Sequence, residues 1–275
     1  PLYSSAASDV YKRQVLFTGG EPTLHPNFSE IIRFAKRLGY EVSVSTNGGK
    51  FEFKNFANKL FPLLDEVCIS LHGHTASLHN FHTQNKQSFQ RVIKCLNFLE
   101  NMKNSARGIV NIVVTKYNFP SIEKIICLVS GFKKIREILI SSMAPEGKGL
   151  EDFEKLTVPF YVLERKIPFL IKLAQEKNLV IRFFGIPFCV LKSDWLFSND
   201  LFWAPTITFE ISKKNNRKYL KRTISLAPTR KRKKTKKCHF CTFKKLCGGI
   251  FEKYLEVFGD KEITPFCEKI YATKT

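Results

Sequence analysis

The chain has 275 residues, of which 44% are hydrophobic, and its formal net charge is +21 at pH 7. This length suffices for one sizeable core with an appendage, and no apolar run approaches the ~20 residues that span a bilayer. The eight cysteines are not packed into a small secreted scaffold, so we expect reduced thiols, available as metal ligands, in a cytoplasmic protein without membrane contact. The charge permits a nucleic-acid partner, but the scattered lysines are typical of solvated surfaces, so that partner is not favoured.

Residues 1–14 fit none of the patterns that follow. Residues 4–14 resemble the translated read-through found at the ends of assembled environmental sequences, and they are left out of the fold prediction. We therefore expect a non-native segment over 1–14, in place of a lost native amino-terminal segment. The expected domains are then a core over 15–185 and a carboxyl-terminal region over 186–275.

Short apolar runs and amphipathic stretches alternate from residue 15 onward. The predicted strands cover residues 15–18, 41–46, 66–71, 108–115, 137–141 and 179–183. The predicted helices lie near residues 27–39, 54–63, 86–102, 120–131 and 157–177. This alternation predicts a parallel sheet with right-handed crossovers, whose ligands lie at the carboxyl ends of the strands.

The most specific string follows the first predicted strand and reads Gly19, Gly20, Glu21, Pro22. Two adjacent glycines let the backbone approach a small polar ligand closely, and a tight turn without a ligand is the alternative for this pair alone. The next predicted strand ends in Thr46-Asn47-Gly48.

The combined string resembles the radical S-adenosylmethionine (SAM) superfamily, in which the Gly-Gly-Glu-Pro backbone receives the methionine amino group of SAM. The resemblance implies SAM-binding residues after successive strands: Gly19, Gly20, Glu21, Pro22, Thr46, Asn47, Ser70, Asn111 and Met143. Ser70 would lie near the ribose and Met143 on the adenine, although a methionine beside a strand end is also a common core residue.

Four histidines, His72, His74, His79 and His82, surround the end of the third predicted strand. We expect residues 74–82 to form a loop before a helix that begins near residue 86. The histidines lack a regular spacing, so a hydrogen-bonded loop or a substrate contact is favoured over a metal site.

The family's core is a six-fold βα partial barrel, with a catalytic Cys-x-x-x-Cys-x-x-Cys loop after its first strand and Gly-Gly-Glu-Pro after its second. Here the first visible strand already ends in Gly-Gly-Glu-Pro, and Cys68, Cys95, Cys127 and Cys189 lack the cluster spacing. The resemblance implies an α/β fold: a partial (β/α)6 TIM-like barrel lacking its first β-strand, cluster loop and helix, plus a small Cys-rich C-terminal extension.

No catalytic residue is assigned, because three thiolates of the cluster loop would have to hold a [4Fe-4S] cluster that leaves one iron open for SAM. This chain is therefore expected to be an inactive fragment. Its full-length parent is expected to cleave SAM reductively to a 5′-deoxyadenosyl radical that abstracts hydrogen from an unidentified substrate: a peptide, a cofactor precursor or RNA. The resemblance also implies a reducing electron donor such as flavodoxin or ferredoxin.

A second cysteine motif, Cys238, Cys241 and Cys247 followed by two glycines, can place three thiolates on one metal centre. Zinc is the plainer alternative. The spacing resembles the SPASM and twitch tails of radical SAM enzymes, with enough cysteines for one auxiliary [4Fe-4S] cluster. Cys189 is favoured as the fourth ligand, and Cys267 is the alternative; His239 is a further available partner.

The basic run over residues 230–237 is expected to be mobile through charge repulsion, and residues 213–237 are expected to form a loop. Its position beside Cys238 supports an alternative function, a basic zinc-binding and RNA-binding module without radical chemistry.

Overall fold

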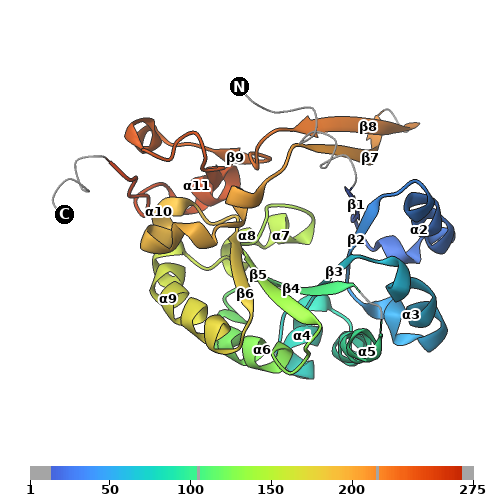
Figure 1. The fold of residues 1–275 in the computed structure, drawn as a ribbon. Helices are drawn as coiled ribbons and strands as arrows, with labels where there is room; N and C mark the ends of the chain where they lie inside the picture. Colours follow the sequence, from blue (N-terminus) through green and yellow to red (C-terminus); the bar gives the residue numbers. More distant parts are fainter. Residues whose placement is uncertain (1–13, 104–105, 215–216, 268–275) are drawn as a thin grey trace.

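Six parallel strands form the centre of the molecule (Figure 1). In this computed structural model, residues 14–103, 106–214 and 217–267 are described. The strand order is β1-β2-β3-β4-β5-β6. The strands are β1 (Gln14–Phe17), β2 (Glu41–Thr46), β3 (Glu66–Ser70), β4 (Arg107–Val113), β5 (Ile135–Ser141) and β6 (Val180–Phe184). All neighbouring pairs are parallel, which confirms the α/β fold; the described strands form an open sheet rather than a closed barrel.

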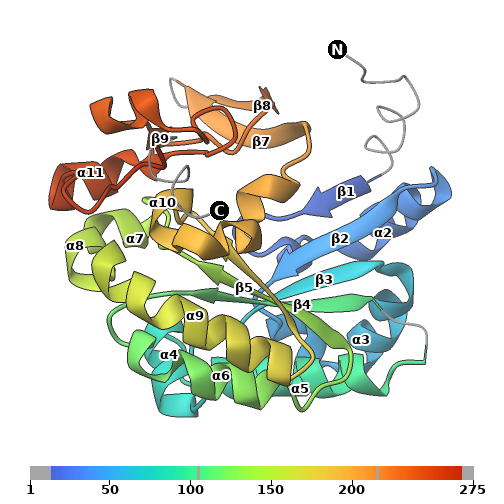
Figure 2. The same cartoon turned by 60° about the vertical axis from the view of Figure 1, so that its left-hand side comes forward.

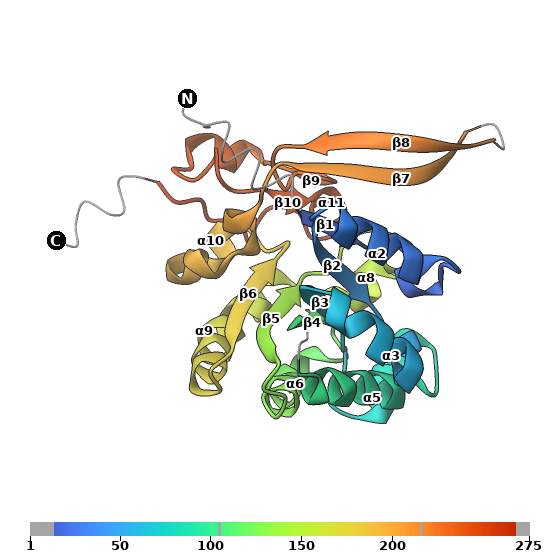
Figure 3. The same cartoon turned by 45° about the vertical axis from the view of Figure 1, so that its right-hand side comes forward.

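Helices connect the strands and cover one face of the sheet (Figure 3). They are α2 (Phe28–Arg37), α3 (Lys54–Leu60), α4 (Ala76–Thr83), α5 (Ser88–Asn101), α6 (Ile122–Val129), α7 (Lys148–Glu151), α8 (Phe153–Leu156) and α9 (Phe160–Glu176). The five predicted helices are confirmed in place and order. The predicted loop over 74–82 is wrong, because Thr75 caps α4 by accepting a hydrogen bond from the Leu78 amide.

The side chains that alternate along each strand divide the sheet into an apolar and a polar face. Val67, Ile69 and Ile138 are fully buried on the face that meets the helices. The other face carries Ser45 and Cys68, which are direct cross-strand partners. This face lies under no helix of the β-α crossovers, so it is the one available for a ligand at the strand ends.

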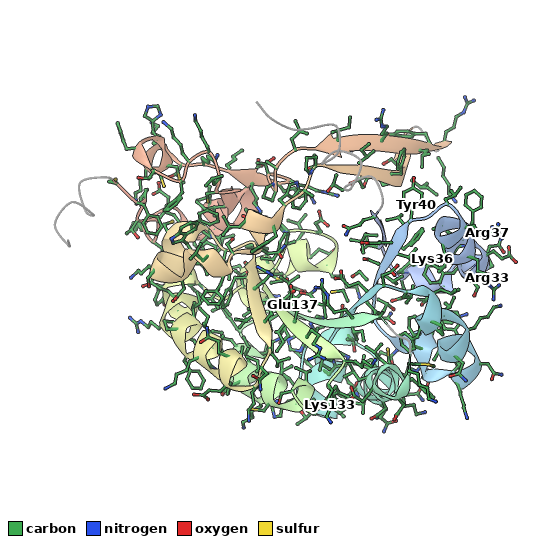
Figure 4. All side chains as sticks on the ribbon, in the orientation of Figure 1. Arg33, Lys36, Arg37, Tyr40, Lys133 and Glu137 are labelled. Atoms are coloured by element: carbon green, nitrogen blue, oxygen red, sulfur yellow. The ribbon has the colours of Figure 1, made fainter. Side chains whose placement is uncertain are left out.

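Basic side chains of α2 point outward from this layered core. Figure 4 shows Arg33, Lys36 and Arg37 at the periphery of the molecule, and Lys36 pairs with Asp65 at 2.7 Å. Such positions are typical of solvated surface charge.

The residues after β6 form a tail that packs together on one side of the sheet (Figure 2). It contains α10 (Phe188–Leu191), the hairpin strands β7 (Thr206–Lys214) and β8 (Arg217–Ser225), the short strands β9 (Arg232–Lys233) and β10 (Ile250–Phe251), and α11 (Glu252–Phe258). Short 3-10 turns complete it, among them η6 (Asn199–Phe202) and η7 (Lys236–Phe240). The predicted loop over 213–237 is therefore wrong, because β7 and β8 pair in antiparallel register and β9 pairs with β10.

The tail is fixed to the core by aromatic packing. Tyr254 of α11 stacks on Phe160 of α9 with ring centroids 3.9 Å apart. Its hydroxyl accepts a hydrogen bond from the Phe160 amide at 2.7 Å and donates to Glu262 at 2.6 Å. Gly185, with φ +74°, allows Phe251 to approach the end of β6, where a Cβ would lie 2.7 Å from its ring.

Residues 1–13 of the expected non-native segment lie outside the described residues, and Gln14 belongs to β1. In the described part of the chain, no helix combines the length and apolar character that a membrane span requires.

Candidate functional site

One carboxylate joins the turn after β1 to the turn after β2. Glu21 accepts hydrogen bonds from the Thr23 hydroxyl at 2.6 Å and the Thr46 hydroxyl at 2.7 Å. It also accepts from the amides of Thr23 at 3.2 Å and Asn47 at 2.6 Å. The predicted residues Glu21, Thr46 and Asn47 thus lie together, and the four donors hold the Glu21 side chain within the protein as the link between the two turns.

The backbone beside this link is open. Gly19 has φ +126°, a conformation that favours glycine. A Cβ built on Gly19 or on Gly20 meets no atom within 4 Å, and both residues are exposed. Pro22 begins the short 3-10 turn η1 (Pro22–Leu24) and directs the chain away. The two glycines therefore present bare main chain to a ligand.

The turn after β2 is held tightly on its other side. The Gly48 amide donates to the Thr46 hydroxyl at 3.0 Å, and a Cβ on Gly48 would lie 3.3 Å from the Cβ of Cys95. Burial and the nearby Glu21 carboxylate raise the pKa of the Cys95 thiol. Cys95 is thus a neutral packing residue behind the turn.

Ser70 and Asn111 lie side by side on the polar face. They are direct partners in β3 and β4, and the Asn111 side-chain oxygen accepts a hydrogen bond from Ser141 at 2.7 Å. Met143, after β5, is 5% exposed and packs in the core. A Cβ on Gly149 would lie 3.5 Å from its sulfur, which agrees with the alternative of a core methionine.

His72, His79 and His82 form a hydrogen-bonded cluster between β3, β4 and α4, whereas Nδ1 of His74 is buried without a hydrogen-bond partner among the described residues. His79 Nδ1 accepts from the His72 amide at 3.0 Å, and His72 Nδ1 accepts from the Val113 amide at 3.3 Å. His82 bonds the Leu78 carbonyl at 2.8 Å and Thr115 at 2.7 Å. Burial, followed by the neighbouring histidines, lowers the pKa of His72 to about 3 and that of His79 to about 4. These bonds agree with the expected hydrogen-bonded role; a helix, α4, carries His79 and His82 in place of the expected loop.

Two ion pairs that were not predicted from the sequence occupy the polar face below the strand ends. Arg107 bonds Glu66, and Arg182 lies 3.5 Å from Glu137, which is labelled in Figure 4. Burial raises the pKa of Glu137, while Arg182 opposes this effect. The sequence does contain a pattern that indicates this polar face, because Glu66, Cys68 and Ser70 alternate with buried apolar residues in one strand.

The cysteines of the tail gather around the start of α10. Burial, then the neighbouring thiols of Cys247 and Cys238, raise the pKa of Cys189 to about 12, with a smaller effect from Cys241. The Cys247 thiol receives hydrogen bonds from the backbone of Phe188 and Gly249. Cys267 is placed differently, with its sulfur 3.8 Å from the Pro265 carbonyl oxygen.

These thiols are close together but do not form a finished coordination site. Across residues 14–103, 106–214 and 217–267, no three Cys, His, Asp or Glu side chains are arranged to hold a metal ion. The donor chemistry of four cysteines fits an iron-sulfur cluster or zinc. The assignment of Cys189, Cys238, Cys241 and Cys247 as ligands stays a prediction.

Known proteins resemble the chain over the part that contains the Gly-Gly turn. The model of the radical SAM superfamily matches residues 5–129. The chain carries a radical SAM domain. The family implies SAM and a [4Fe-4S] cluster as cofactors, and the exposed backbone of Gly19 and Gly20 in this domain fits a ligand that binds main chain.

Curated relatives of the radical SAM domain are enzymes. A probable GTP 3′,8-cyclase of Saccharolobus solfataricus is 36% identical over 161 residues, which cover 56% of this chain and 49% of that protein. The mycofactocin maturase MftC of Mycobacterium ulcerans is 29% identical over 153 residues, which cover 54% of this chain and 40% of that protein. The chain thus spans about half the length of the curated relatives that it matches.

A solved structure shares the fold of the domain. The Streptococcus suis protein SuiB, in its crystal structure bound to precursor peptide SuiA, gives a TM-score of 0.51 at 15% sequence identity. The match covers 66% of this chain and 42% of SuiB. At this identity the similarity concerns the fold alone.

Proposed function

We propose that the chain is the SAM-binding core and tail of a radical SAM enzyme, with the core over residues 15–185 and the tail over 186–275. In the complete enzyme, reductive cleavage of SAM gives a 5′-deoxyadenosyl radical that abstracts hydrogen from the substrate. The observation that carries this proposal is the open Gly19–Gly20 backbone beside the Glu21 link, at the carboxyl ends of parallel strands.

The residues of this chain would bind and orient SAM rather than supply the catalytic cluster. The backbone of Gly19 and Gly20 would take the methionine end, and the polar pair Ser70 and Asn111 would lie along the ribose. Met143 would contact the adenine from the core side. The printed sequence contains no Cys-x-x-x-Cys-x-x-Cys, so we assign the catalytic cluster ligands to protein outside it.

The first test concerns the reaction itself. Anaerobic incubation of the chain with SAM and dithionite is expected to yield no 5′-deoxyadenosine, because the sequence has no Cys-x-x-x-Cys-x-x-Cys motif to hold a cluster beside the SAM turn. Chromatography of the products measures this. Robust production by a variant with Cys238, Cys241 and Cys247 changed to Ala would contradict the assignment of the catalytic ligands to another segment.

Gly20→Val is expected to weaken SAM binding by roughly tenfold or more, because loss of a hydrogen bond to a charged group costs about 1.5–3 kcal/mol. The branched side chain would fill the open space beside the turn without meeting other protein atoms, so the fold should be retained. Equilibrium dialysis with labelled SAM measures the affinity.

The matched control is Gly131→Val, at a glycine after α6 where a Cβ meets one carbonyl oxygen, that of Leu128, at 3.4 Å. This variant should bind SAM as the parent chain does. Equal affinities of the Gly20→Val variant and the parent would count against the assigned turn.

The tail cysteines support a proposal of one auxiliary [4Fe-4S] cluster, ligated by Cys189, Cys238, Cys241 and Cys247. The argument for Cys189 is its position, since the Cys247 thiol receives a hydrogen bond from the backbone of Phe188, the residue before Cys189. Cys189 also connects the end of the core to the tail. The Cys267 sulfur instead contacts a carbonyl oxygen of its own segment.

Cys189→Ala is expected to abolish cluster iron in anaerobically purified protein, whereas Cys267→Ala should retain it. Iron analysis and visible charge-transfer absorption measure the cluster. Cys127→Ala, at an exposed cysteine of α6, is the control and should change nothing. Iron loss only in Cys267→Ala would identify the other ligand, and a colourless zinc protein would contradict the cluster.

The RNA-binding alternative rests on the basic run over 230–237, and contacts of that run argue against it. Arg230 lies 3.3 Å from Glu146, Lys233 lies 3.4 Å from Glu252, and Lys237 lies 3.6 Å from Asp260. Arg232 is buried. Much of this charge is thus compensated within the protein.

The proposed classes of substrate and reductant rest on the family resemblance alone. The relatives include a probable GTP 3′,8-cyclase and a mycofactocin maturase, and SuiB was solved with a precursor peptide. We therefore keep a peptide, a cofactor precursor or RNA as substrate classes, and flavodoxin or ferredoxin as the electron donor.

A further inference from the structure

The hairpin of β7 and β8 has its apolar face turned away from the protein. Cross-strand partners share a face of a two-stranded sheet, and the pairs Ile207–Ile224, Phe209–Arg222 and Ile211–Leu220 lie on one face. The five apolar side chains of this face are between 49% and 74% exposed. We call these six residues, together with Lys218 on the same side of β8, the outer face.

The opposite face carries polar residues and Tyr219, and its β7 positions are the more covered ones, whereas residues 217–224 of β8 are exposed on both faces. Along β7, the side chains of Thr208, Glu210 and Ser212 are partly buried, whereas the alternate residues are exposed. Glu210 lies 3.2 Å from Lys221 on the same face and 3.9 Å from Arg230, which in turn pairs with Glu146 after β5. Strand β7 therefore turns its polar side toward the protein, the reverse of ordinary burial.

Exposure of these apolar side chains to water is unfavourable for an isolated hairpin. A two-stranded sheet is marginally stable in water, and contiguous exposed apolar surface usually marks an interaction site. Figure 3 shows the hairpin extending past α2, and its described strands pair only with each other. The outer face therefore has the character of an interaction surface.

The charges on the outer face define the chemistry of that partner. Arg222 lies opposite Phe209, and Lys218 precedes Leu220 on the same side of β8; both basic side chains are exposed. Across the described positions of this face there is no carboxylate, because Glu210 is on the other side. A partner with apolar and acidic residues would satisfy both features.

A second copy of this chain fits less well. Two outer faces in contact would bring Arg222 and Lys218 of both copies together, and each chain carries a net charge of +21. RNA also fits less well, because the centre of the face is aliphatic and has one aromatic ring, that of Phe209, for base stacking.

We propose that the outer face of the β7–β8 hairpin is a docking surface for an acidic amphipathic segment of a partner protein. The apolar side of the segment covers Ile207, Phe209, Ile211, Leu220 and Ile224, and its carboxylates pair with Arg222 and Lys218. This surface is independent of the SAM turn.

The test uses a fluorescent acidic amphipathic peptide, with leucines along one side and glutamates on the other, and fluorescence anisotropy. The double variant Ile211→Ser and Leu220→Ser should bind it roughly tenfold more weakly, since two buried apolar side chains are lost. The matched control, Thr208→Ser with Thr223→Ser, changes the opposite face and should bind as the parent chain does. A peptide with lysines in place of the glutamates should not bind.

Four results would overturn the proposal. Equal binding by the two double variants would show attraction by net charge alone, and binding of the lysine peptide would remove the acidic requirement. Dimerisation of the parent chain that is lost in Ile211→Ser, measured by light scattering, would assign the face to a second copy. Preferential binding of single-stranded RNA that depends on the same two residues would assign it to nucleic acid. Ile211, Leu220 and Thr223 are exposed, and the partly buried Thr208 keeps its hydroxyl when changed to Ser. Equal unfolding curves are therefore expected for both double variants and the parent.

Discussion

Arg232→Met is expected to lower the free energy of unfolding by about 3–5 kcal/mol, the cost of removing one partner of a buried ion pair. Arg232 bonds Asp200 at 2.7 Å, and the side chains are 2% and 1% exposed. The guanidinium carbon lies 4.8 Å from the Phe184 ring centroid and 5.0 Å from that of Phe251. The substitution would leave the Asp200 carboxylate buried beside Gly248 without its cation.

Urea unfolding measures the change, and two variants test its cause. Lys155→Met breaks an exposed pair with Asp152 and should cost little, because surface pairs contribute about 0–1 kcal/mol. Adding Asp200→Ala to Arg232→Met should restore part of the loss, because no uncompensated charge then remains. Equal costs for Arg232→Met and Lys155→Met would show that the pair does not hold the tail in place.

The stability of the protein is expected to fall steeply as the pH decreases from about 6.5 to 4. The pKa of His72 is lowered to about 3 and that of His79 to about 4, so both stay neutral in the folded protein. In the unfolded chain they take up protons below about 6.5, which favours unfolding. The slope contributed by each histidine approaches about 1.4 kcal/mol per pH unit within this window and disappears above it.

His79→Asn should flatten this dependence, because the amide oxygen can still accept the His72 amide hydrogen but does not titrate. His25→Asn, at an exposed histidine after η1, is the matched control for the same substitution outside the cluster. The measurement is urea unfolding at a series of pH values. A profile for His79→Asn that is parallel to the parent between pH 4 and 6.5 would refute the neutral cluster.

The core could be predicted from the sequence because its signals are local. Each parallel strand is a short apolar run between amphipathic stretches, so β2 was predicted with its observed bounds and the other five within one or two residues. The family resemblance assigned Glu21, Thr46 and Asn47 to the ends of the first two strands, whereas the hydrogen bonds that join them are visible only in the structure. The prediction failed at α4, where a loop was expected. This helix is short and rich in polar residues, so it lacks a clear apolar period, and Thr75 caps its start.

The tail was predicted poorly because its contacts are distant in sequence. The pattern Ile207, Phe209, Ile211 alternates with polar residues, so β7 could have been recognised. The burial of Arg232 could not have been predicted, because the local concentration of charge indicates a solvated run. The compensating Asp200 lies 32 positions away in the sequence. By contrast, the sequence suggested the cysteine motif with Cys189 as its fourth member, and in the structure the Cys247 thiol receives a hydrogen bond from the backbone of Phe188.

The Glu21 link also has a consequence for the thermodynamics of association. Four donors from two turns already converge on one carboxylate, so the main chain around Gly19 and Asn47 is held in one arrangement before any ligand arrives. A ligand that binds this backbone would lose little conformational entropy on the protein's side. Its association rate would then be set by diffusion into the site rather than by the ordering of a loop.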